Sequence, residues 1–488
     1  MWQKIKPHIP LLSILTLAAL LRLIAVFKYG DFWDDEMFNF IYSQKSWPQG
    51  LVYWLWETNP PLHLLVLKIW LYFFPAIEFF ARLPSVIAGV ATVYVIYKFG
   101  EEIFSKKTAY IAALYLAIHP YHIFWSATAR IYAIFMLLAI CSVWFFFRTY
   151  FIDNNRHNRR CHAVANLFLI FAHLSSVFLL AGQFVSLIIL KGKTAAIDWI
   201  KLNLLPGIIG LIWILASLAV KSGNDLGSAW FLNMAHSFTS AVNPLINIIA
   251  GQYPIYAGII LVGASVILLS GATIKKIQAK DNRFIFLLII ALTPIALSFA
   301  CDVWHIKFFL SALPLVVLAL AESLSIAFKK LVSSLMIIAV VCSIGLYRLW
   351  ITLPLTDWKN IELFYVNHAK DKTALVYNNY ILKSQIDRYL PNNISAPALP
   401  LLLYENMGWD DMVVKKNYLF IQLSKEKIDD WYAEHNLDNF EKIILLQGEY
   451  NYMNRLTTTL EDNGWKKTDG PERARLSGYY NLYFYEKN

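Results

Sequence analysis

The chain has 488 residues, of which 58% are hydrophobic and only 16% are charged. A soluble domain of this length does not carry so much apolar surface, so the composition indicates a polytopic membrane protein. The net charge of +10 is uneven: residues 1–350 hold 27 Lys/Arg and 14 Asp/Glu, and residues 351–488 hold 16 and 19. The positive charge therefore lies between hydrophobic spans, without a basic domain that would bind nucleic acid. Neither a disulfide framework nor a CxxC metal site is indicated by the four scattered cysteines, which are Cys141, Cys161, Cys301 and Cys342.

The N-terminal segment carries Lys4 and Lys6 before the apolar run Leu11–Phe27. A signal peptide begins in the same way, but no small-residue cleavage site follows and Arg22 interrupts the run. The segment is therefore predicted to be an uncleaved first span. An arginine is costly in hydrocarbon, so Arg22 is expected to find a partner inside the bundle.

Eleven spans are predicted, most of them near the roughly 20 residues that a helix needs to cross the bilayer. They are 11–27, 83–99, 109–126, 131–150, 163–175, 176–190, 204–220, 254–271, 284–300, 308–324 and 332–350. If the N-terminus is cytoplasmic, the loops on that side hold 18 Lys/Arg and the opposite loops hold 8. This distribution follows the positive-inside bias and supports an odd number of spans. We call the resulting assignment of each loop to the inside or the outside charge parity.

Two apolar stretches are assigned by this parity. Residues 163–190 lie between basic clusters that are both expected inside, so they cross twice as short helices or dip in and return. Pro60–Phe74 is predicted to lie against the outer leaflet, because a crossing there would invert every later loop. A true crossing of Pro60–Phe74 remains the alternative.

After Arg348 the composition changes, and residues 351–488 are predicted to be a soluble α/β domain that follows a transmembrane domain of residues 1–350. The expected helices are 358–370, 383–390, 425–434 and 452–463, and the expected strands are 373–377, 418–423, 442–446 and 479–485. The domain has no Gly-rich phosphate loop, so nucleotide binding is not expected. Charge parity places it outside the cytoplasm.

The first outer loop, residues 28–81, contains the sequence Asp-Phe-Trp-Asp-Asp-Glu at 31–36. Asp34 can cap a following helix, with Asp35 and Glu36 in its positive first turn. A carboxylate at this position could accept a proton from an acceptor hydroxyl or ligate a divalent cation. The alternative is a solvated helix cap among interfacial aromatic residues.

The same loop continues with Trp-Glu-Thr-Asn-Pro-Pro-Leu-His at 56–63. The two prolines fix the entry to the next helix and leave Glu57 and His63 near the membrane interface. These residues either mark the start of a helix or take part in catalysis.

A short outer turn between two spans holds His119, His122, Arg130 and Tyr132. An arginine at the outer boundary can bind a lipid phosphate with two parallel hydrogen bonds. The alternative is interfacial anchoring by a snorkelling side chain.

The last outer turn runs from Asp302 through His305 to Lys307. Lys307 could contact the phosphate from the opposite side or pair with Asp302. His173, at the apex of the 163–190 hairpin, is expected at the same level, where it contacts the phosphate or is an ordinary buried histidine.

In their order and spacing these segments resemble one known family. The segments are Asp-Glu at 35–36, Asn-Pro-Pro-Leu at 59–62, Glu-Phe-Phe-Ala-Arg-Leu-Pro-Ser at 78–85 with Ala-Gly at 88–89, Ala-Arg-Ile-Tyr at 129–132, Ala-His at 172–173 and Lys-Phe-Phe-Leu-Ser-Ala-Leu-Pro at 307–314. They resemble the bacterial relatives of the dolichyl-phosphate-mannose protein mannosyltransferases, which include the lipid A aminoarabinose transferase. The resemblance covers about residues 10–325 and implies the GT-C membrane fold, a multi-span helix bundle, before the C-terminal α/β domain.

The resemblance implies an inverting transfer of a sugar from a polyprenyl-phosphate donor to a lipid, glycan or protein acceptor, on the outer face of the bacterial inner membrane. It implies that Asp35 is the catalytic base with Glu36 beside it, although Asp34 is the alternative match to the family's acid, and it implies donor-phosphate contacts for Arg130, Lys307 and His173. Candidate acceptor or metal contacts are Glu57, His63, His119, His122, Tyr132 and His305. No cofactor is required by these motifs, although a divalent cation remains open.

This chain departs from some relatives of the family at two positions: Asn59 stands where they have a lysine, and Tyr132 stands where they have an acid. The sugar and the acceptor therefore cannot be carried over. Two other classes remain as alternatives: a flippase for lipid-linked glycans, and an anchored binding protein whose C-terminal domain is the working part. A flippase would need acids and broken helices near mid-membrane in two similar halves, which the sequence lacks.

Overall fold

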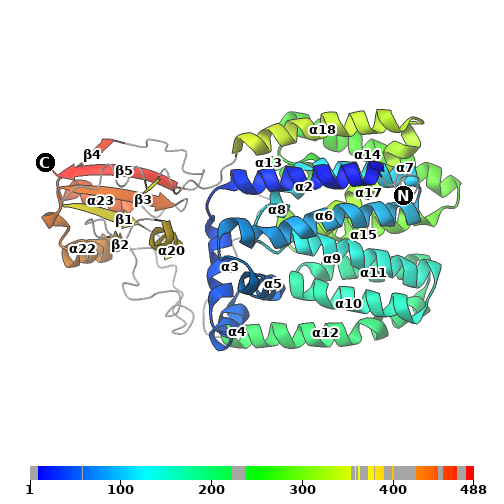
Figure 1. Ribbon diagram of the computed structural model, residues 1–488, viewed down its shortest axis with the longest axis horizontal. Coiled ribbons are helices and arrows are strands. Elements are labelled where there is room, and N and C mark those ends of the chain that lie inside the picture. The colour runs from blue at the N-terminus through cyan, green and yellow to red at the C-terminus, as the bar shows by residue number, and fades with distance from the viewer. Residues whose placement is uncertain are drawn as a thin grey trace. The chain divides into compact units, whose positions relative to one another are not determined.

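The computed structural model describes residues 9–57, 59–221, 237–352, 358, 361–362, 372–377, 380–389, 398–400, 425–448, 454–469 and 480–487. The chain forms two compact units (Figure 1). The first comprises Met1–Phe27, Tyr42–Val220 and Ala229–Thr352, and the second comprises Lys28–Ile41, Lys221–Ser228 and Leu353–Asn488. The boundary near the N-terminus falls within helix α3 (Asp34–Gln44).

Eight helices of the described residues are long and apolar enough to cross a membrane. They are α2 (Ile9–Tyr29), α6 (Glu78–Ile103), α9 with its π-helical end η2 (Tyr132–Ile152), α12 (Lys193–Lys221), α14 (Ile255–Gln278), α15 (Asn282–Ala300), α16 to α17 (Ile306–Ala327) and α18 (Leu331–Thr352). They run side by side in the first unit (Figure 1). The chain is a multi-pass membrane protein, as its composition predicted.

Three further predicted spans correspond to shorter helices. The span predicted at 109–126 is interrupted, since α7 (Lys106–Ile118) ends before α8 (Pro120–Ser126). The two spans predicted at 163–190 form a hairpin of α10 (Arg156–Ala172) and α11 (Ser176–Leu190). With 17 and 15 residues, these helices are about 25 and 22 Å long. The predicted fold class is confirmed.

Short helices lie at one end of the bundle (Figure 1). They include α4 (Trp47–Trp56) and α5 (Leu62–Phe73). With 12 residues, α5 is about 18 Å long, which is too short to cross about 30 Å of hydrocarbon. The structure therefore favours the prediction that Pro60–Phe74 does not cross.

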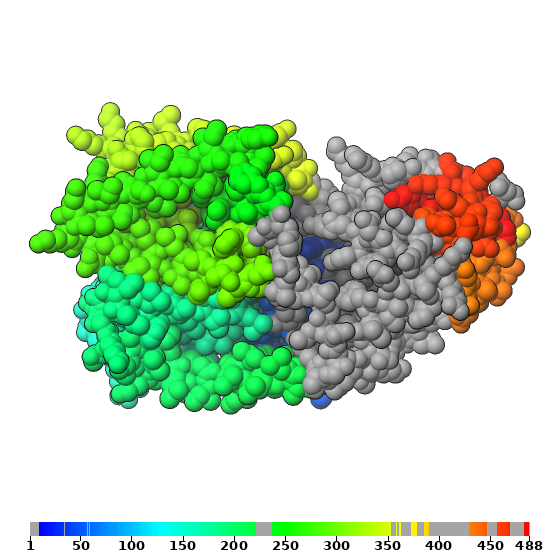
Figure 2. All heavy atoms as spheres, turned by 180° about the vertical axis from the view of Figure 1, so that it is seen from behind, coloured from blue at the N-terminus to red at the C-terminus, as the bar shows by residue number. Residues whose placement is uncertain are grey.

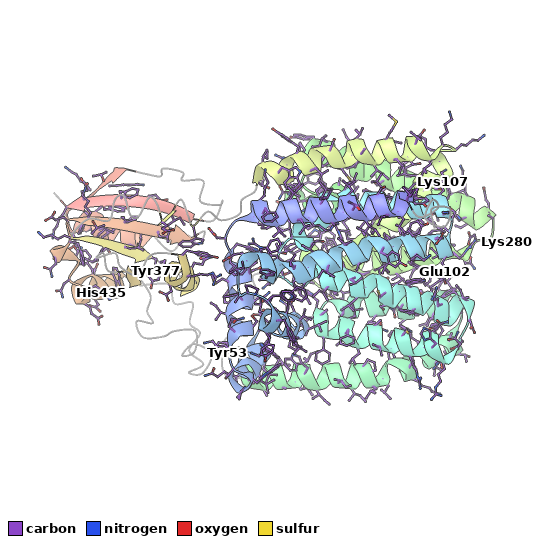
Figure 3. The ribbon with its side chains drawn as sticks, viewed as in Figure 1. Tyr53, Glu102, Lys107, Lys280, Tyr377 and His435 are labelled. Atoms are coloured by element: carbon purple, nitrogen blue, oxygen red, sulfur yellow. The ribbon has the colours of Figure 1, made fainter. Side chains whose placement is uncertain are left out.

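The opposite end of the bundle is rich in ion pairs, and we call it the basic end. Figure 3 shows Glu102, Lys107 and Lys280 at this end and Tyr53 at the other. Arg148 Nη2 and Glu102 Oε2 are 2.6 Å apart and join η2, the π-helical end of α9, to α6. Lys276 Nζ lies 2.7 Å from Glu322 Oε1, which joins α14 to α17. Both pairs connect neighbouring helices where the polypeptide turns back into the bundle.

The carboxylate of Asp281 caps α15 at the basic end. It accepts hydrogen bonds from the Arg283 amide and guanidinium, and it lies 3.0 Å from Lys276 Nζ. Burial alone would raise the pKa of the Asp281 carboxyl, but the hydrogen bonds from Arg283 and Lys276 outweigh it and lower this pKa to about 2. The ionised carboxylate is therefore the form that stabilises the fold.

An Asp281→Asn variant is expected to lower the free energy of unfolding at pH 7 by about 1 kcal/mol, because asparagine keeps the cap but loses both ion pairs. The folded-state pKa lies below the unfolded value, so this stabilisation is present at neutral pH and is lost as the pH falls from about 4 to about 2. Chemical denaturation of both proteins in detergent, at pH 7, 5 and 3, measures the difference. If the free energies of unfolding of the two proteins differed by the same amount at pH 7 and at pH 3, the charge of Asp281 would not be the source of the stabilisation.

The outer helices expose apolar side chains that suit contact with lipid. Leu205 and Ile212 of α12 are 66% and 61% exposed, and Ile260 and Ile267 of α14 are each 73% exposed. Both helices belong to the green surface of the first unit in Figure 2. In water this surface would be unfavourable, so it is the part of the bundle that requires a bilayer.

Inside the bundle, a buried polar network joins α9, α10, α11 and α12. Gln183 Nε2 donates to Ser142 Oγ over 2.7 Å, and Asn166 Nδ2 donates to Asn203 Oδ1 over 2.7 Å. His162 Nε2 lies 3.1 Å from Gln183 Oε1. Hydrogen bonds between helices hold them in register where lipid gives no hydrophobic driving force. The network therefore fixes the α10–α11 hairpin, whose turn carries His173.

The described part of the second unit contains a five-stranded mixed sheet with the order β2-β1-β3-β5-β4. Its strands are β1 (Thr373–Tyr377), β2 (Ala398–Pro400), β3 (Lys442–Gly448), β4 (Trp465–Asp469) and β5 (Tyr480–Lys487). Strands β2, β1 and β3 are parallel, whereas β5 is antiparallel to both β3 and β4. All five residues of β1 are buried, as expected of a central parallel strand.

Helices α20 (Tyr380–Tyr389), α22 (Lys425–Glu434) and α23 (Asn454–Asp462) complete this unit. Trp431 and Tyr432 of α22 pack with Leu456 and Leu460 of α23 in its hydrophobic core. The described elements agree with the α/β pattern predicted from the sequence, including α22 at 425–434. The strand predicted at 418–423 and most of the helix predicted at 358–370 lie outside the described residues.

Candidate functional site

The acidic segment, defined here as residues 31–36, leads into α3. The helix begins at Asp34, and the Glu36 amide donates to the Trp33 carbonyl over 2.9 Å. Asp34 is therefore the first helical residue, one position further along than the cap role predicted for it. All three acids lie in the first turn, where the helix dipole favours carboxylates. Glu36 is fully buried and Asp35 is half-buried, whereas the side chain of Asp34 lies outside the described part of the structure.

Arg130 is positioned through its backbone by two helices of the first unit. His63 of α5 is buried, and its Nε2 donates to the Ala129 carbonyl over 2.8 Å. The Ser85 hydroxyl of α6 donates to the Arg130 carbonyl over 3.2 Å. His63, predicted as an acceptor or metal contact, therefore supports the turn that carries Arg130.

Four side chains meet around the ring of Tyr132, and we call the five residues together the Tyr132 cluster. The guanidinium carbon of Arg130 lies 5.7 Å from the ring centroid, and Lys307 Nζ lies 5.8 Å from it. The His173 ring centroid lies 5.9 Å from that of Tyr132, and the Trp125 centroid lies at 4.2 Å. Lys307 Nζ is also 5.8 Å from the Trp125 ring. The structure thus brings together the three residues predicted as donor-phosphate contacts.

The His173 ring has a defined orientation in this cluster. Its Nδ1 accepts from the Ser175 amide over 3.2 Å, and the Ser175 hydroxyl lies 2.8 Å from the same atom. The neutral ring therefore carries its proton on Nε2, where it can donate to an anion. The rings of Phe135 and Phe308 lie 5.0 and 6.0 Å from it, centroid to centroid. The cluster combines two cations and an imidazole donor with apolar walls, which suits a phosphate attached to a lipid.

The break between α7 and α8 explains the partner of Arg22. Pro120 has no amide hydrogen, so the Leu116 carbonyl loses its normal helical donor. Arg22 replaces it, with Nη2 at 3.2 Å from the Leu116 carbonyl and Nη1 at 3.0 Å from the Ala117 carbonyl. Nη2 also lies 2.5 Å from His122 Nδ1. A buried arginine in the first span thus stabilises the helix end that precedes the Tyr132 cluster.

His119 and Gly89 complete this buried junction. His119 Nδ1 accepts from the His122 amide over 3.3 Å, and its Nε2 donates to the Ile249 carbonyl over 3.1 Å. A Cβ at position 89 would lie 2.9 Å from Arg22 Nε and would also clash with Ser126. The two histidines predicted as acceptor or metal contacts therefore have structural hydrogen bonds here.

An Arg22→Met variant is expected to lose at least about 3 kcal/mol of unfolding free energy, because it leaves several buried carbonyls without a donor. Arg22→Lys, which can reach fewer of these acceptors, is expected to lose less. Thermal denaturation of the purified proteins in one detergent compares them. A methionine variant as stable as the parent would show that Arg22 does not stabilise the α7 end.

Two other predicted residues have local structural contacts. Glu57 follows α4, and its amide donates to the Tyr53 carbonyl over 2.9 Å. His305 caps α16, since its Nδ1 accepts from the Lys307 amide over 3.2 Å. His305 thereby fixes the backbone from which the Lys307 side chain extends.

Within the described ranges, no group of three or more His, Cys, Asp or Glu side chains is placed to hold a metal ion. The residues missed by the sequence reasoning are those that support the cluster: Trp125, Ser85, Ser175 and Arg22's carbonyl partners. Their contacts are to backbone groups or rings, which leave no motif at fixed spacing.

Residues 58–190 match the sequence model of one family, Dolichyl-phosphate-mannose-protein mannosyltransferase. The matched range contains His63, Arg130, Tyr132 and His173. No curated protein matches the chain.

Several solved structures share the fold. ArnT from Cupriavidus metallidurans in the apo state has a TM-score of 0.63 at 10% identity, covering 97% of this chain and 97% of ArnT. The same protein bound to undecaprenyl phosphate has a TM-score of 0.56 at 11% identity, with 97% of each chain covered. The oligosaccharyltransferase AglB from Archaeoglobus fulgidus, in complex with an inhibitory peptide and a dolichol-phosphate, has a TM-score of 0.51 at 13% identity, covering 90% of this chain and 70% of AglB. The chain therefore has the fold of ArnT along almost its whole length, as the resemblance implied, and its residues 58–190 match the sequence model of the mannosyltransferase family.

Proposed function

We propose that this chain is a glycosyltransferase that moves a hexose or pentose from a polyprenyl-phosphate donor to a lipid, glycan or protein acceptor. The observation that carries the proposal is the Tyr132 cluster, where Arg130 and Lys307 approach the same aromatic ring beside the His173 donor. ArnT, which shares the fold, has been solved with undecaprenyl phosphate bound. That complex supports a lipid phosphate as the ligand of this cluster.

The donor side of the reaction follows from the charges. Transfer breaks the bond between the sugar's anomeric carbon and the phosphate oxygen, and the electron pair leaves with the polyprenyl phosphate. The phosphate gains negative charge at that moment, so fixed cations in a water-poor pocket lower the barrier. Arg130 can bind two phosphate oxygens, while Lys307 supplies a point charge and His173 Nε2 a neutral donor.

The acceptor side requires a base. The acceptor hydroxyl forms the new bond to the anomeric carbon from the face opposite the phosphate, which inverts the configuration, and its proton passes to a carboxylate. Asp35 is the proposed base because its side chain is half-buried, whereas Glu36 is fully buried. Asp34, the neighbour in the first turn of α3, is the alternative.

The charge distribution supports one orientation of the bundle. The basic end, where Lys107 and Lys280 lie, is proposed to face the cytoplasm, in keeping with the positive-inside bias. By the order of the spans along the chain, the loops that carry the Tyr132 cluster, and residues 351–488, are proposed to lie on the other side of a bacterial inner membrane, in the periplasm or exterior.

A labelled transfer assay tests the proposed function. The purified full chain in nanodiscs is incubated with polyprenyl-phosphate sugars, labelled in the sugar, and with lipid and protein fractions of the cell envelope. Label is expected to move to one fraction, together with release of polyprenyl phosphate. Mass spectrometry of a deletion strain is expected to find the acceptor of the cell envelope without this sugar. If no donor yields transfer while labelled lipid-linked glycan instead crosses the bilayer of proteoliposomes, the chain is a flippase.

A further inference from the structure

Residues 28–41, which include the acidic segment, belong to the same compact unit as residues 353–488, the second unit. Within the described part of residues 353–488, helix α20 and Trp358 contact this segment. Gln385, Arg388 and Tyr389 are spaced i, i+3 and i+4, so they share one face of that helix. This face and the acidic segment are far apart in the sequence but form one structure.

Among the described residues, hydrogen bonds from α20 and from Trp358 reach Asp31 and Phe32, just before the three acids of the first turn of α3. The Phe32 amide donates to the Tyr389 hydroxyl over 2.9 Å, and the Phe32 carbonyl accepts from Gln385 Nε2 over 3.2 Å. The Asp31 carboxylate accepts from the Trp358 amide over 2.8 Å. Both backbone groups of Phe32 are therefore bonded to the C-terminal unit, one residue before Trp33, whose carbonyl accepts the first helical bond.

Arg388 adds a second contact with the same segment. Its guanidinium carbon lies 4.6 Å from the ring centroid of Phe40 and 5.3 Å from that of Phe32. It is also 5.6 Å from the ring centroid of Tyr389, whose ring stacks with Trp358 at 5.8 Å. A cation among several aromatic faces stabilises their arrangement, more so when it is shielded from water. Arg388 therefore links the start of the acidic segment to the second turn of α3.

We propose that Gln385, Arg388 and Tyr389 are positioning residues of the transfer reaction, which hold Asp35 and its neighbours in the orientation in which a carboxylate can receive the acceptor's proton. The inference rests on the proposed function. It assigns the second unit a role in the chemical step. A base that is misplaced by about 1 Å can lose much of its effect, which makes three modest contacts important for the rate.

Tyr389→Phe is the first test, because it removes one hydroxyl and keeps the ring that stacks with Trp358. Its kcat is expected to fall about 3- to 10-fold, in keeping with the loss of one hydrogen bond. The KM for the polyprenyl-phosphate sugar is expected to stay unchanged, since the proposed donor contacts belong to the other unit. Tyr432→Phe is the matched control, because its hydroxyl bonds to Asp438 and Trp465 of the same unit.

Arg388 provides the second test. Arg388→Ala is expected to lower kcat about 10-fold or more, and Arg388→Lys, which keeps a cation near Phe40, is expected to restore most of the rate. A variant that had merely lost its fold would not be rescued selectively in kcat. Hydrogen exchange of the full chain in nanodiscs gives a readout that does not depend on activity. In Tyr389→Phe and Arg388→Ala, the amides of residues 32–44 are expected to exchange faster than in the parent chain. The amides of α9 are expected to exchange at the parent rate.

The outcomes separate this inference from the proposed function. Unchanged exchange at 32–44, or faster exchange with an unchanged kcat, overturns the positioning role. A fall in kcat of equal size in Tyr432→Phe also overturns it, because that result would reflect general loosening of the unit. If the parent chain transfers no sugar from any donor, the proposed function fails, and the catalytic role inferred for α20 fails with it even where exchange shows that the segment is held.

Discussion

An Arg130→Ala variant is expected to transfer sugar about 10²- to 10³-fold more slowly than the parent chain, the loss typical when one preorganised group that stabilises a developing anion is removed. The backbone at this position is held by His63 and Ser85, so the variant is expected to fold. Initial rates of label transfer in nanodiscs, at saturating donor and at donor well below KM, measure the effect. Most of the loss is expected in kcat, because the phosphate gains charge in the transition state.

Two further variants distinguish a phosphate contact from a general effect of charge. Arg130→Lys keeps the charge but not the paired hydrogen bonds, so it is expected to recover only part of the rate. Arg348→Ala removes an arginine of α18 outside the Tyr132 cluster and is expected to transfer at the parent rate. If Arg130→Ala and Arg348→Ala have the same rate, Arg130 does not contact the departing phosphate.

Charge parity predicted the membrane face of the residues in the Tyr132 cluster, but not their contacts with one another. Parity assigned Arg130, His173 and Lys307 to one face of the membrane, since each follows or precedes a predicted span on that face. Parity cannot say that three residues of one face touch, because it orders the chain only along the membrane normal. That they converge on Tyr132 depends on how α9, α10 and α16 pack.

The contacts of Arg22 and of Phe32 could not have been predicted. Arg22 was expected to find a partner, yet two of its partners are the Leu116 and Ala117 carbonyls at the end of α7, and a carbonyl has no sequence signature. Phe32 is bonded to α20 through its own backbone. The sequence separation of more than three hundred residues gives no local pattern for such a contact. Helices and strands were predictable because hydrophobic periodicity is local, whereas these junctions are not.

The Asp35→Asn variant carries the second large effect expected of this chain. Asparagine keeps the size of the side chain but cannot accept the acceptor's proton, so kcat is expected to fall about 10²- to 10⁴-fold. Binding of undecaprenyl phosphate, used as a probe of the donor site, is expected to stay unchanged. Label transfer and probe affinity, both measured on the full chain in nanodiscs, give these two quantities.

Neighbouring substitutions decide which acid is the base. Asp34→Asn is expected to lower the rate less than Asp35→Asn, whereas Glu36→Gln is expected mainly to lower thermal stability, because Glu36 is fully buried. A large loss in Asp34→Asn with a nearly normal Asp35→Asn would move the base to Asp34. If both asparagine variants transferred sugar at the parent rate, neither Asp34 nor Asp35 would be the base. The acceptor's proton would then have to leave by another route.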